Sequence, residues 1–182
     1  MNGDNREPLV WALLDDRAGN RSQCLGVVEA LGLPYETREL QYRSLAALPN
    51  ALLGASFLGL TGDTRKELSP PWPSILIGAG RRTAPVARRI KQLAGGRVFA
   101  VQIMGPGSGR GGFDLVAVPR HDGEIGGDNV MTITGAPHGL TASALAAARQ
   151  EWEPRLSGFA SPRIAVIVGG STRRREFSDA MA

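Results

Sequence analysis

The sequence predicts an α/β fold: a Rossmann-like parallel sheet with helices on both faces. Apolar runs of strand length alternate along the 182 residues with amphipathic stretches of helix length. The 24 glycines and 12 prolines mark tight turns between these elements, and a 42% apolar content is enough to bury a core. The length suits one domain of ordinary size and excludes two complete nucleotide-binding domains or an α/β barrel.

The predicted sheet begins with Leu9 to Leu14, an uninterrupted apolar run that is typical of a buried parallel strand. Asn20 and Gln23 follow at the spacing of a capping box. Apolar side chains then recur at helical spacing from Cys24 to Leu31, which predicts an amphipathic helix. Tyr35 to Leu40 predicts the second strand.

The middle of the chain predicts two more strands joined by a helix. Ser74 to Ile77 is the third strand, and 78–80 form a glycine turn behind it. A helix with apolar side chains on one face from Val86 to Leu93 follows, and Arg97 to Ile103 predicts the fourth strand.

The last part predicts three further strands and one helix. Phe113 to Val118 and Asn129 to Ile133 are the fifth and sixth strands, and Thr141 caps an alanine-rich helix that reaches Leu156. Arg163 to Val168 predicts a seventh strand. Short connections between strands and helices imply right-handed crossovers in one parallel sheet, whose ligands bind outside the carboxyl ends of the strands.

The charge is basic but modest. Lys and Arg total 21 against 17 Asp and Glu, for a net charge of +4, and all but two of the 21 are arginine. Arginine binds carboxylate or phosphate through two parallel hydrogen bonds. The bias reflects either a coding preference of the gene or an anionic ligand or surface. Aromatic residues make up only 5%, which argues against stacked bases, so we expect no specific nucleic-acid partner.

Cysteine and histidine are scarce. Cys24 is the single cysteine, which excludes a disulfide framework and a cysteine-based zinc site. His121 and His138 are the only histidines, so we predict no metal site. Met1 to Pro8 is polar and lacks the apolar run of a signal peptide. Together these observations predict a cytoplasmic protein.

One stretch, Ser44 to Gly62, carries no charge and has a length that could span a bilayer. Proline, asparagine, glycine and hydroxyl residues interrupt it and make insertion costly. It predicts a broken helix that either covers the protein or touches a membrane peripherally through Leu45–Leu60.

The first strand ends in a polar turn that is a candidate substrate-binding site. Residues 15–23 bring helix-terminal N–H groups, a hydroxyl and two guanidinium groups to one strand end, and the candidate binding residues among them are Asp16, Gly19, Asn20 and Gln23. Such a turn suits an anion or a sugar hydroxyl. The alternative is a well-capped turn with solvated charges.

The third strand ends in a second candidate binding site, formed by Gly78, Gly80, Arg81 and Arg82. A glycine turn that follows a strand and opens a helix is typical of dinucleotide binding, but Thr83 replaces the third glycine. The chain also lacks a Tyr-x-x-x-Lys pair. A nicotinamide enzyme is therefore disfavoured, and the turn either binds a phosphate or carboxylate or is structural.

The fifth strand ends in candidate catalytic residues. His121 can act as a general acid or base because histidine titrates near neutral pH, and Asp122 can orient it. His138 could face the same cleft, and an ordinary surface histidine is the alternative. The glycines of 105–112 superficially suggest a phosphate loop, but they lack Gly-Lys-Ser/Thr and precede a strand, which disfavours nucleotide triphosphate hydrolysis.

These motifs, taken in order, resemble one family. They are Asp-Asp-Arg-Ala-Gly-Asn-Arg-Ser-Gln at 15–23, Gly-Ala-Gly-Arg-Arg-Thr at 78–83, Val-Gln-Ile at 101–103, Pro-x-His-Asp at 119–122 and Gly-Gly at 169–170. The set resembles the Elm-type mitochondrial-fission family, whose bacterial members are often labelled predicted nucleoside-diphosphate-sugar epimerases. Such proteins look like relatives of GT-B glycosyltransferases, which have two Rossmann-like domains around a cleft.

The resemblance implies that 1–160 form the amino-terminal Rossmann-like domain and that 161–182 supply the first strand and glycine turn of a truncated second domain. Gly19, Asn20, Gly80, Arg81, His121 and Asp122 would face the cleft, and Gly169, Gly170 and Ser171 would begin the half that binds the donor. The implied function is glycosyl transfer or nucleoside-diphosphate-sugar epimerisation, incomplete in this chain, with a nucleotide-sugar as substrate and no certain cofactor. The alternative is a non-catalytic membrane-associated or recruiting module.

Overall fold

The computed structural model describes residues 8–123, 126–166 and 177–178. The chain divides into two compact units, Met1–Leu140 and Thr141–Ala182. The predicted domains, 1–160 and 161–182, concern a longer two-domain plan and stay a prediction.

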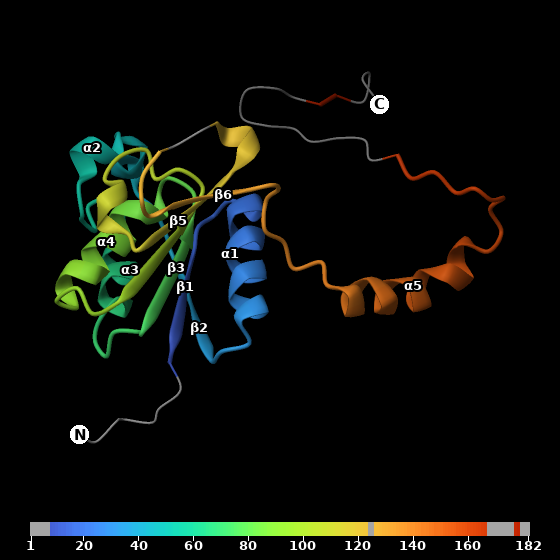
Figure 1. The fold of residues 1–182 in the computed structure, drawn as a ribbon, viewed down its shortest axis with the longest axis horizontal. Coiled ribbons are helices and arrows are strands. Elements are labelled where there is room, and N and C mark those ends of the chain that lie inside the picture. Colours follow the sequence, from blue (N-terminus) through green and yellow to red (C-terminus); the bar gives the residue numbers. More distant parts are fainter. Residues whose placement is uncertain (1–7, 124–125, 167–176, 179–182) are drawn as a thin grey trace. The chain divides into compact units, whose positions relative to one another are not determined.

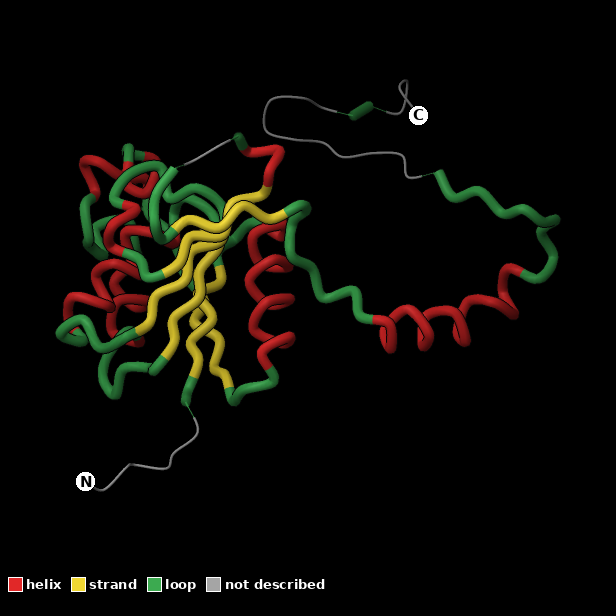
Figure 2. The backbone as a smooth tube through the Cα atoms, in the orientation of Figure 1, coloured by secondary structure: helices red, strands yellow, loops and turns green. Residues whose placement is uncertain are grey.

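The described part of the first unit is built on one six-stranded sheet in which all strands are parallel. The strands lie side by side in the order β2-β1-β3-β4-β5-β6 (Figure 2). Because all of them are parallel, their carboxyl ends meet at one edge. They are β1 (Val10–Leu14), β2 (Tyr35–Glu39), β3 (Ile75–Ala79), β4 (Phe99–Ile103), β5 (Leu115–Pro119) and β6 (Val130–Ile133). The predicted parallel sheet is confirmed.

Helices cover both faces of the sheet, as predicted (Figure 1). On one face α1 (Ala18–Leu31) packs Cys24 and Val28 against side chains of β1, β3 and β4. On the other face α4 (Thr83–Leu93) joins a second apolar core. All five residues of β1 are buried, because this strand is central and covered on both faces, as its apolar run predicted.

The uncharged stretch folds as a broken segment between β2 and α3 (Gly62–Glu67). It contains a short 3-10 helix, Ser44–Ala47, and the one-turn helix α2 (Asn50–Leu53), as its interruptions predicted. We call residues 44–60 the leucine strap. No helix in the described part of the chain has both the length and the apolar character needed to cross a bilayer.

The structure differs from the predicted elements at three places that bear on the site or on the predicted second domain. Gly78 and Ala79 are the last residues of β3 and not a turn, because they continue its pairing with β4. Helix α1 begins at Ala18 and not behind an Asn20 cap, because the Asp15 carboxylate already accepts the N–H of Arg17 at 2.8 Å. Of the seventh strand predicted at Arg163–Val168, the described residues 163–166 form none, and 167–168 lie outside the described residues.

The second unit contains α5 (Ala142–Leu156). The predicted cap is confirmed, since the Thr141 hydroxyl accepts the N–H of Ala144 at 3.1 Å. No residue of α5 is buried, and its turns carry the ion pairs Arg149–Glu153 and Arg155–Glu151.

Burial makes the single thiol of the chain unreactive. Cys24 lies fully buried under β3, where its Sγ donates to the carbonyl of Ile77 at 3.4 Å. Burial, reinforced by the nearby Asp15 carboxylate, raises the pKa of the Cys24 thiol from 9.0 to about 12. Since only the thiolate is a nucleophile, we expect the folded protein to react with Ellman's reagent about a thousandfold more slowly than the protein in guanidinium. Rapid stoichiometric labelling of the folded protein would contradict this environment.

Candidate functional site

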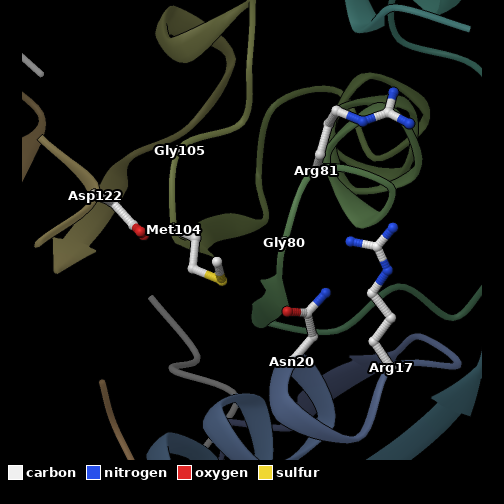
Figure 3. A pocket seen from close by; sticks show the side chains of 7 residues that line it. All are labelled: Arg17, Asn20, Gly80, Arg81, Met104, Gly105 and Asp122. Carbon is white, nitrogen blue, oxygen red and sulfur yellow. The ribbon is translucent and has the colours of Figure 1, made fainter. Parts of the chain in front are cut away.

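A pocket of about 320 Å³, which we call the rim pocket, lies at the edge where four parallel strands end. Figure 3 shows the side chains of Asn20, Met104 and Asp122 pointing toward one space, although they follow three different strands. The lining residues come from the ends of β1, β3, β4 and β5: Arg17, Asn20, Gly80, Arg81, Met104, Gly105 and Asp122. The parallel topology thus brings together three predicted turns that are far apart in sequence.

The first turn is organised by a buried carboxylate. Asp15 is 2% exposed, and its Oδ2 accepts a hydrogen bond from Asn20 Nδ2 at 2.8 Å. Its other oxygen accepts the N–H of Arg17. Asn20 therefore lies in the first turn of α1 with its carboxamide held at the pocket.

The predicted glycines serve two different close approaches. A Cβ on Gly78 would lie 2.9 Å from Thr83 Oγ1, so Gly78 allows β3 to pack closely against α4. Gly80 has φ +81°, and a Cβ there would lie 2.2 Å from Asn20 Nδ2. The buried Gln102 on β4 donates from Nε2 to the Gly80 carbonyl at 3.0 Å and holds this turn in place.

Arg81 lines the pocket, but its guanidinium turns away toward the leucine strap (Figure 3). Its Nη1 donates to the carbonyl of Leu48 at 2.7 Å, and its Nη2 donates to the carbonyl of Ala46 at 3.0 Å. Asn50, which lies in the strap, makes hydrogen bonds in the opposite direction: its Nδ2 donates to the carbonyls of Arg81 and Pro106, both at 2.7 Å. The two side chains join the strap, the β3–α4 turn and the loop after β4.

Arg82 is neutralised by two carboxylates. It forms an ion pair with Asp16, and its Nη2 lies 3.5 Å from Asp15 Oδ2. Its guanidinium carbon stacks 4.4 Å from the centre of the Tyr42 ring. Burial raises the pKa of the Tyr42 phenol above its ordinary value. The guanidinium groups of Arg81 and Arg82 are therefore already engaged, and their predicted role in ligand binding stays a prediction.

Arg17 is the cation that this network leaves available. No carboxylate in residues 8–123, 126–166 or 177–178 pairs with its guanidinium, which rises from the start of α1 beside Gly80 (Figure 3). Opposite it, Met104 has φ +68°, a left-handed conformation that is costly for a residue with a side chain. Gln23 Nε2 lies 3.7 Å from Met104 Sδ and supports this side chain from α1.

Only one residue of the predicted catalytic pair lines the pocket. His121 and Asp122 form a short 3-10 helix after β5, and His121 Nε2 lies 3.7 Å from Asp122 Oδ1. Asp122 lines the pocket, whereas His121 is not among the lining residues and its side chain is 66% exposed. His138 does not face this site: its backbone passes over Gly26 in the middle of α1.

The remaining predicted residues lie outside the rim pocket. Asp16 lines a neighbouring pocket of about 390 Å³ between the ends of β1 and β2, where Arg21 and Glu39 form a two-point ion pair. Hydrogen bonds from Arg21 lower the pKa of Glu39 below its ordinary 4.5. Gly19 is in the first turn of α1 and has no neighbour that a Cβ would meet. Gly169, Gly170 and Ser171 lie outside the described residues.

Four residues that shape the site are not among the predicted site residues: Arg17, Met104, Asn50 and Gln102. Arg17 and Gln102 lie inside motifs that carry the family resemblance, which is the signal that could have found them. Asn50 sits in the uncharged stretch, where it reads only as an interruption. The described residues contain no cluster of three or more His, Cys, Asp or Glu side chains that could hold a metal ion.

Comparisons with known proteins agree with these motifs. A model of the Mitochondrial fission ELM1 family matches residues 18–182. An uncharacterized protein of Rickettsia prowazekii, RP120, is 29% identical in an alignment that covers 95% of this chain and 57% of that protein. The Mitochondrial fission protein ELM1 of Arabidopsis thaliana is 29% identical over 65% of this chain and 33% of its own length.

No solved structure matches the chain significantly. The chain spans a third to just over half of the length of these two relatives. Because the family model covers nearly the whole sequence, the chain belongs to the Mitochondrial fission ELM1 family.

Proposed function

We propose that this chain supplies the amino-terminal half of a nucleotide-sugar crevice in a GT-B-like enzyme that transfers a glycosyl group or epimerises a nucleoside-diphosphate-sugar. The observation that carries the proposal is the rim pocket, in which residues from four strand ends meet, among them the polar Arg17, Asn20 and Asp122. Ligands of open parallel sheets bind at this edge. The pocket also combines Arg17, whose guanidinium has no ion-pair partner among the described residues, with hydrogen-bonding groups at the start of α1.

The chemistry is assigned to the end of β5. His121 would be the general acid or base, and Asp122, 3.7 Å from its Nε2, would orient it. In whichever reaction applies, Arg17 and the start of α1 would stabilise negative charge on a diphosphate. This assignment rests on position and residue type, because fold alone does not determine the reaction.

Binding tests the proposal first. Titration of the 182-residue chain with UDP-glucose and GDP-mannose, followed by amide chemical shifts, should show saturable changes around Asn20, Gly80 and Asp122. We expect dissociation constants near 1 mM, because the titrated chain spans only 57% of the length of the Rickettsia relative and would supply half of the proposed crevice. If neither nucleotide-sugar produces saturable changes at the rim pocket, the proposal is wrong.

Turnover tests the catalytic assignment. In any assay in which the chain consumes a nucleotide-sugar, His121→Ala should lower kcat about 10²-fold or more and leave binding unchanged. The matched control is His138→Ala, because His138 lies against α1 and away from the pocket. Equal kcat values for the two variants would remove His121 from the mechanism.

A second candidate function, a peripheral membrane contact, is favoured by the leucine strap. Its inner side chains Leu53 and Leu60 are buried, while Leu52 and Leu58 are 71% and 51% exposed. The hydrogen bonds of Arg81 and Asn50 hold the strap to the domain, so its outer leucines are presented on a fixed backbone. The Arabidopsis relative is named as a mitochondrial fission protein, which is consistent with a recruiting role.

Vesicle binding separates this candidate from a plain covering segment. We expect the chain to sediment with phosphatidylcholine vesicles that contain phosphatidylglycerol, and the double variant Leu52→Gln, Leu58→Gln to bind about tenfold less tightly. The control changes Leu31 and Leu93 to Gln, since these leucines are also exposed, at 45% and 43%, on α1 and α4. If both double variants lose binding equally, the strap has no special role.

A further inference from the structure

The rim pocket offers hydrogen-bond acceptors of defined orientation. A carboxylate can only accept, so Asn20 must direct its Nδ2 donor to Asp15 Oδ2, 2.8 Å away. Asp15 is buried and is held in place by the Arg17 N–H. Exchanging the nitrogen and oxygen of the Asn20 amide would therefore place two acceptors against each other. The oxygen of Asn20 is consequently the atom that faces Met104 and Asp122 (Figure 3).

The polarity of the pocket specifies the groups that its ligand must carry. Asn20 Oδ1 and the Asp122 carboxylate both require donors, and ligand hydroxyls supply them. Arg17 requires an anionic oxygen, and no described carboxylate provides one. Met104 places an apolar side chain between the two acceptors, suited to the C–H face of a ring.

Other ligand classes fit less well. A bare polyanion would meet the Asp122 carboxylate, while the guanidinium groups of Arg81 and Arg82 are engaged elsewhere. A nucleobase would find no aromatic ring among the seven lining residues. The volume of about 320 Å³ lies at the lower end of the range for small-molecule sites, roughly 300–1,000 Å³, and suits a fragment better than a whole nucleotide-sugar.

We infer that the rim pocket holds the sugar-phosphate portion of the ligand, with Arg17 on the phosphate and with Asn20 Oδ1 and Asp122 accepting from sugar hydroxyls. The nucleoside lies outside this pocket. The inference rests on the proposed function and adds to it the orientation of the ligand and the residues that distinguish its two parts.

A thermodynamic comparison of two phosphate esters tests the inference. Glucose 1-phosphate carries both sugar hydroxyls and a phosphate, whereas phenyl phosphate carries the phosphate on an apolar ring without sugar hydroxyls. Titrating the 182-residue chain, we expect Arg17→Gln to weaken both ligands about tenfold, because it removes the cation. Asp122→Asn should weaken glucose 1-phosphate about tenfold and leave phenyl phosphate unchanged or slightly tighter.

Matched controls keep the charge changes comparable. Arg21→Gln removes a cation one turn further along α1, in the neighbouring pocket, and Asp63→Asn removes an exposed carboxylate on α3. Neither should change the affinity for glucose 1-phosphate by more than about twofold. The inference is overturned if Arg17→Gln and Arg21→Gln behave alike, or if Asp122→Asn weakens both esters equally.

The same titrations separate this inference from the proposed function. If glucose 1-phosphate binds in the expected pattern while UDP-glucose and GDP-mannose do not bind, the pocket assignment stands and the nucleotide-sugar function fails. If the nucleotide-sugars bind but UMP binds as tightly and the Arg17 and Asp122 variants have no effect, the function stands and the pocket assignment fails. If none of these ligands binds, both are wrong.

Discussion

Gly80→Ala should destabilise the protein by about 2–4 kcal/mol and abolish ligand binding at the rim pocket. Gly80 has φ +81°, which costs an alanine about 1 kcal/mol or more. The new Cβ would also stand 2.2 Å from Asn20 Nδ2 and push that amide off Asp15. The buried carboxylate then loses a donor, which adds about 1–3 kcal/mol. Urea unfolding measures the free-energy difference.

Gly32→Ala separates the two contributions. Gly32 ends α1 with φ +64°, but no atom lies within 4 Å of the position that its Cβ would take. We expect this variant to lose only the backbone contribution, about 1 kcal/mol, and to bind ligand normally. Similar losses of unfolding free energy for the two variants would show that Asn20 does not depend on its close approach to Gly80.

Asn50→Ala should cost about 2–4 kcal/mol of unfolding free energy, although the residue is small and polar. Asn50 is 3% exposed, and its Nδ2 serves two carbonyls at 2.7 Å. Alanine leaves the buried Pro106 carbonyl and the partly buried Arg81 carbonyl without this donor, and it also deprives Arg81 Nη1 of an acceptor at 3.2 Å. Urea unfolding again provides the measurement.

Asn129→Ala is the matched control for this prediction. Asn129 also donates from Nδ2 to two carbonyls, those of Arg110 and Phe113, but it is only partly buried. Water can replace its hydrogen bonds, so we expect a loss of unfolding free energy nearer 1 kcal/mol.

A double-mutant cycle that combines Asn50→Ala with Arg81→Met should give a coupling free energy of about 1–2 kcal/mol. An absence of coupling would mean that the two side chains act independently.

The sheet was predictable because its signals are local. The apolar run that forms β1 has side chains on both faces of the strand, and these leave water only if both faces are covered. Parallel strands place the turns that follow them at one edge of the sheet. The convergence of Asn20, Gly80 and Asp122 follows from that rule. The exact ends of β3 and α1 did not follow, because pairing with β4 and the Asp15 carboxylate decide them.

Local sequence patterns could not predict which arginine guanidinium groups are paired in the folded chain and which is available. Arg81 and Arg82 are adjacent in sequence, yet one binds carbonyls of the leucine strap and the other pairs with Asp16, 66 residues away. Arg17 has no carboxylate partner among the described residues although Asp15 and Asp16 precede it directly. Which guanidinium is available depends on distances between strand ends, and those exist only in the folded chain.

The burial of the Cys24 thiol has a practical consequence. Because it is the chain's only cysteine, is fully buried and has a raised pKa, we expect that spectroscopic probes can be attached elsewhere without first deleting it. One cysteine introduced at Lys66 on α3 and another at Ser143 on α5 would each take a maleimide dye or a nitroxide. Energy transfer or dipolar spectroscopy would then report the separation of the two compact units in solution and its change as ligand is added.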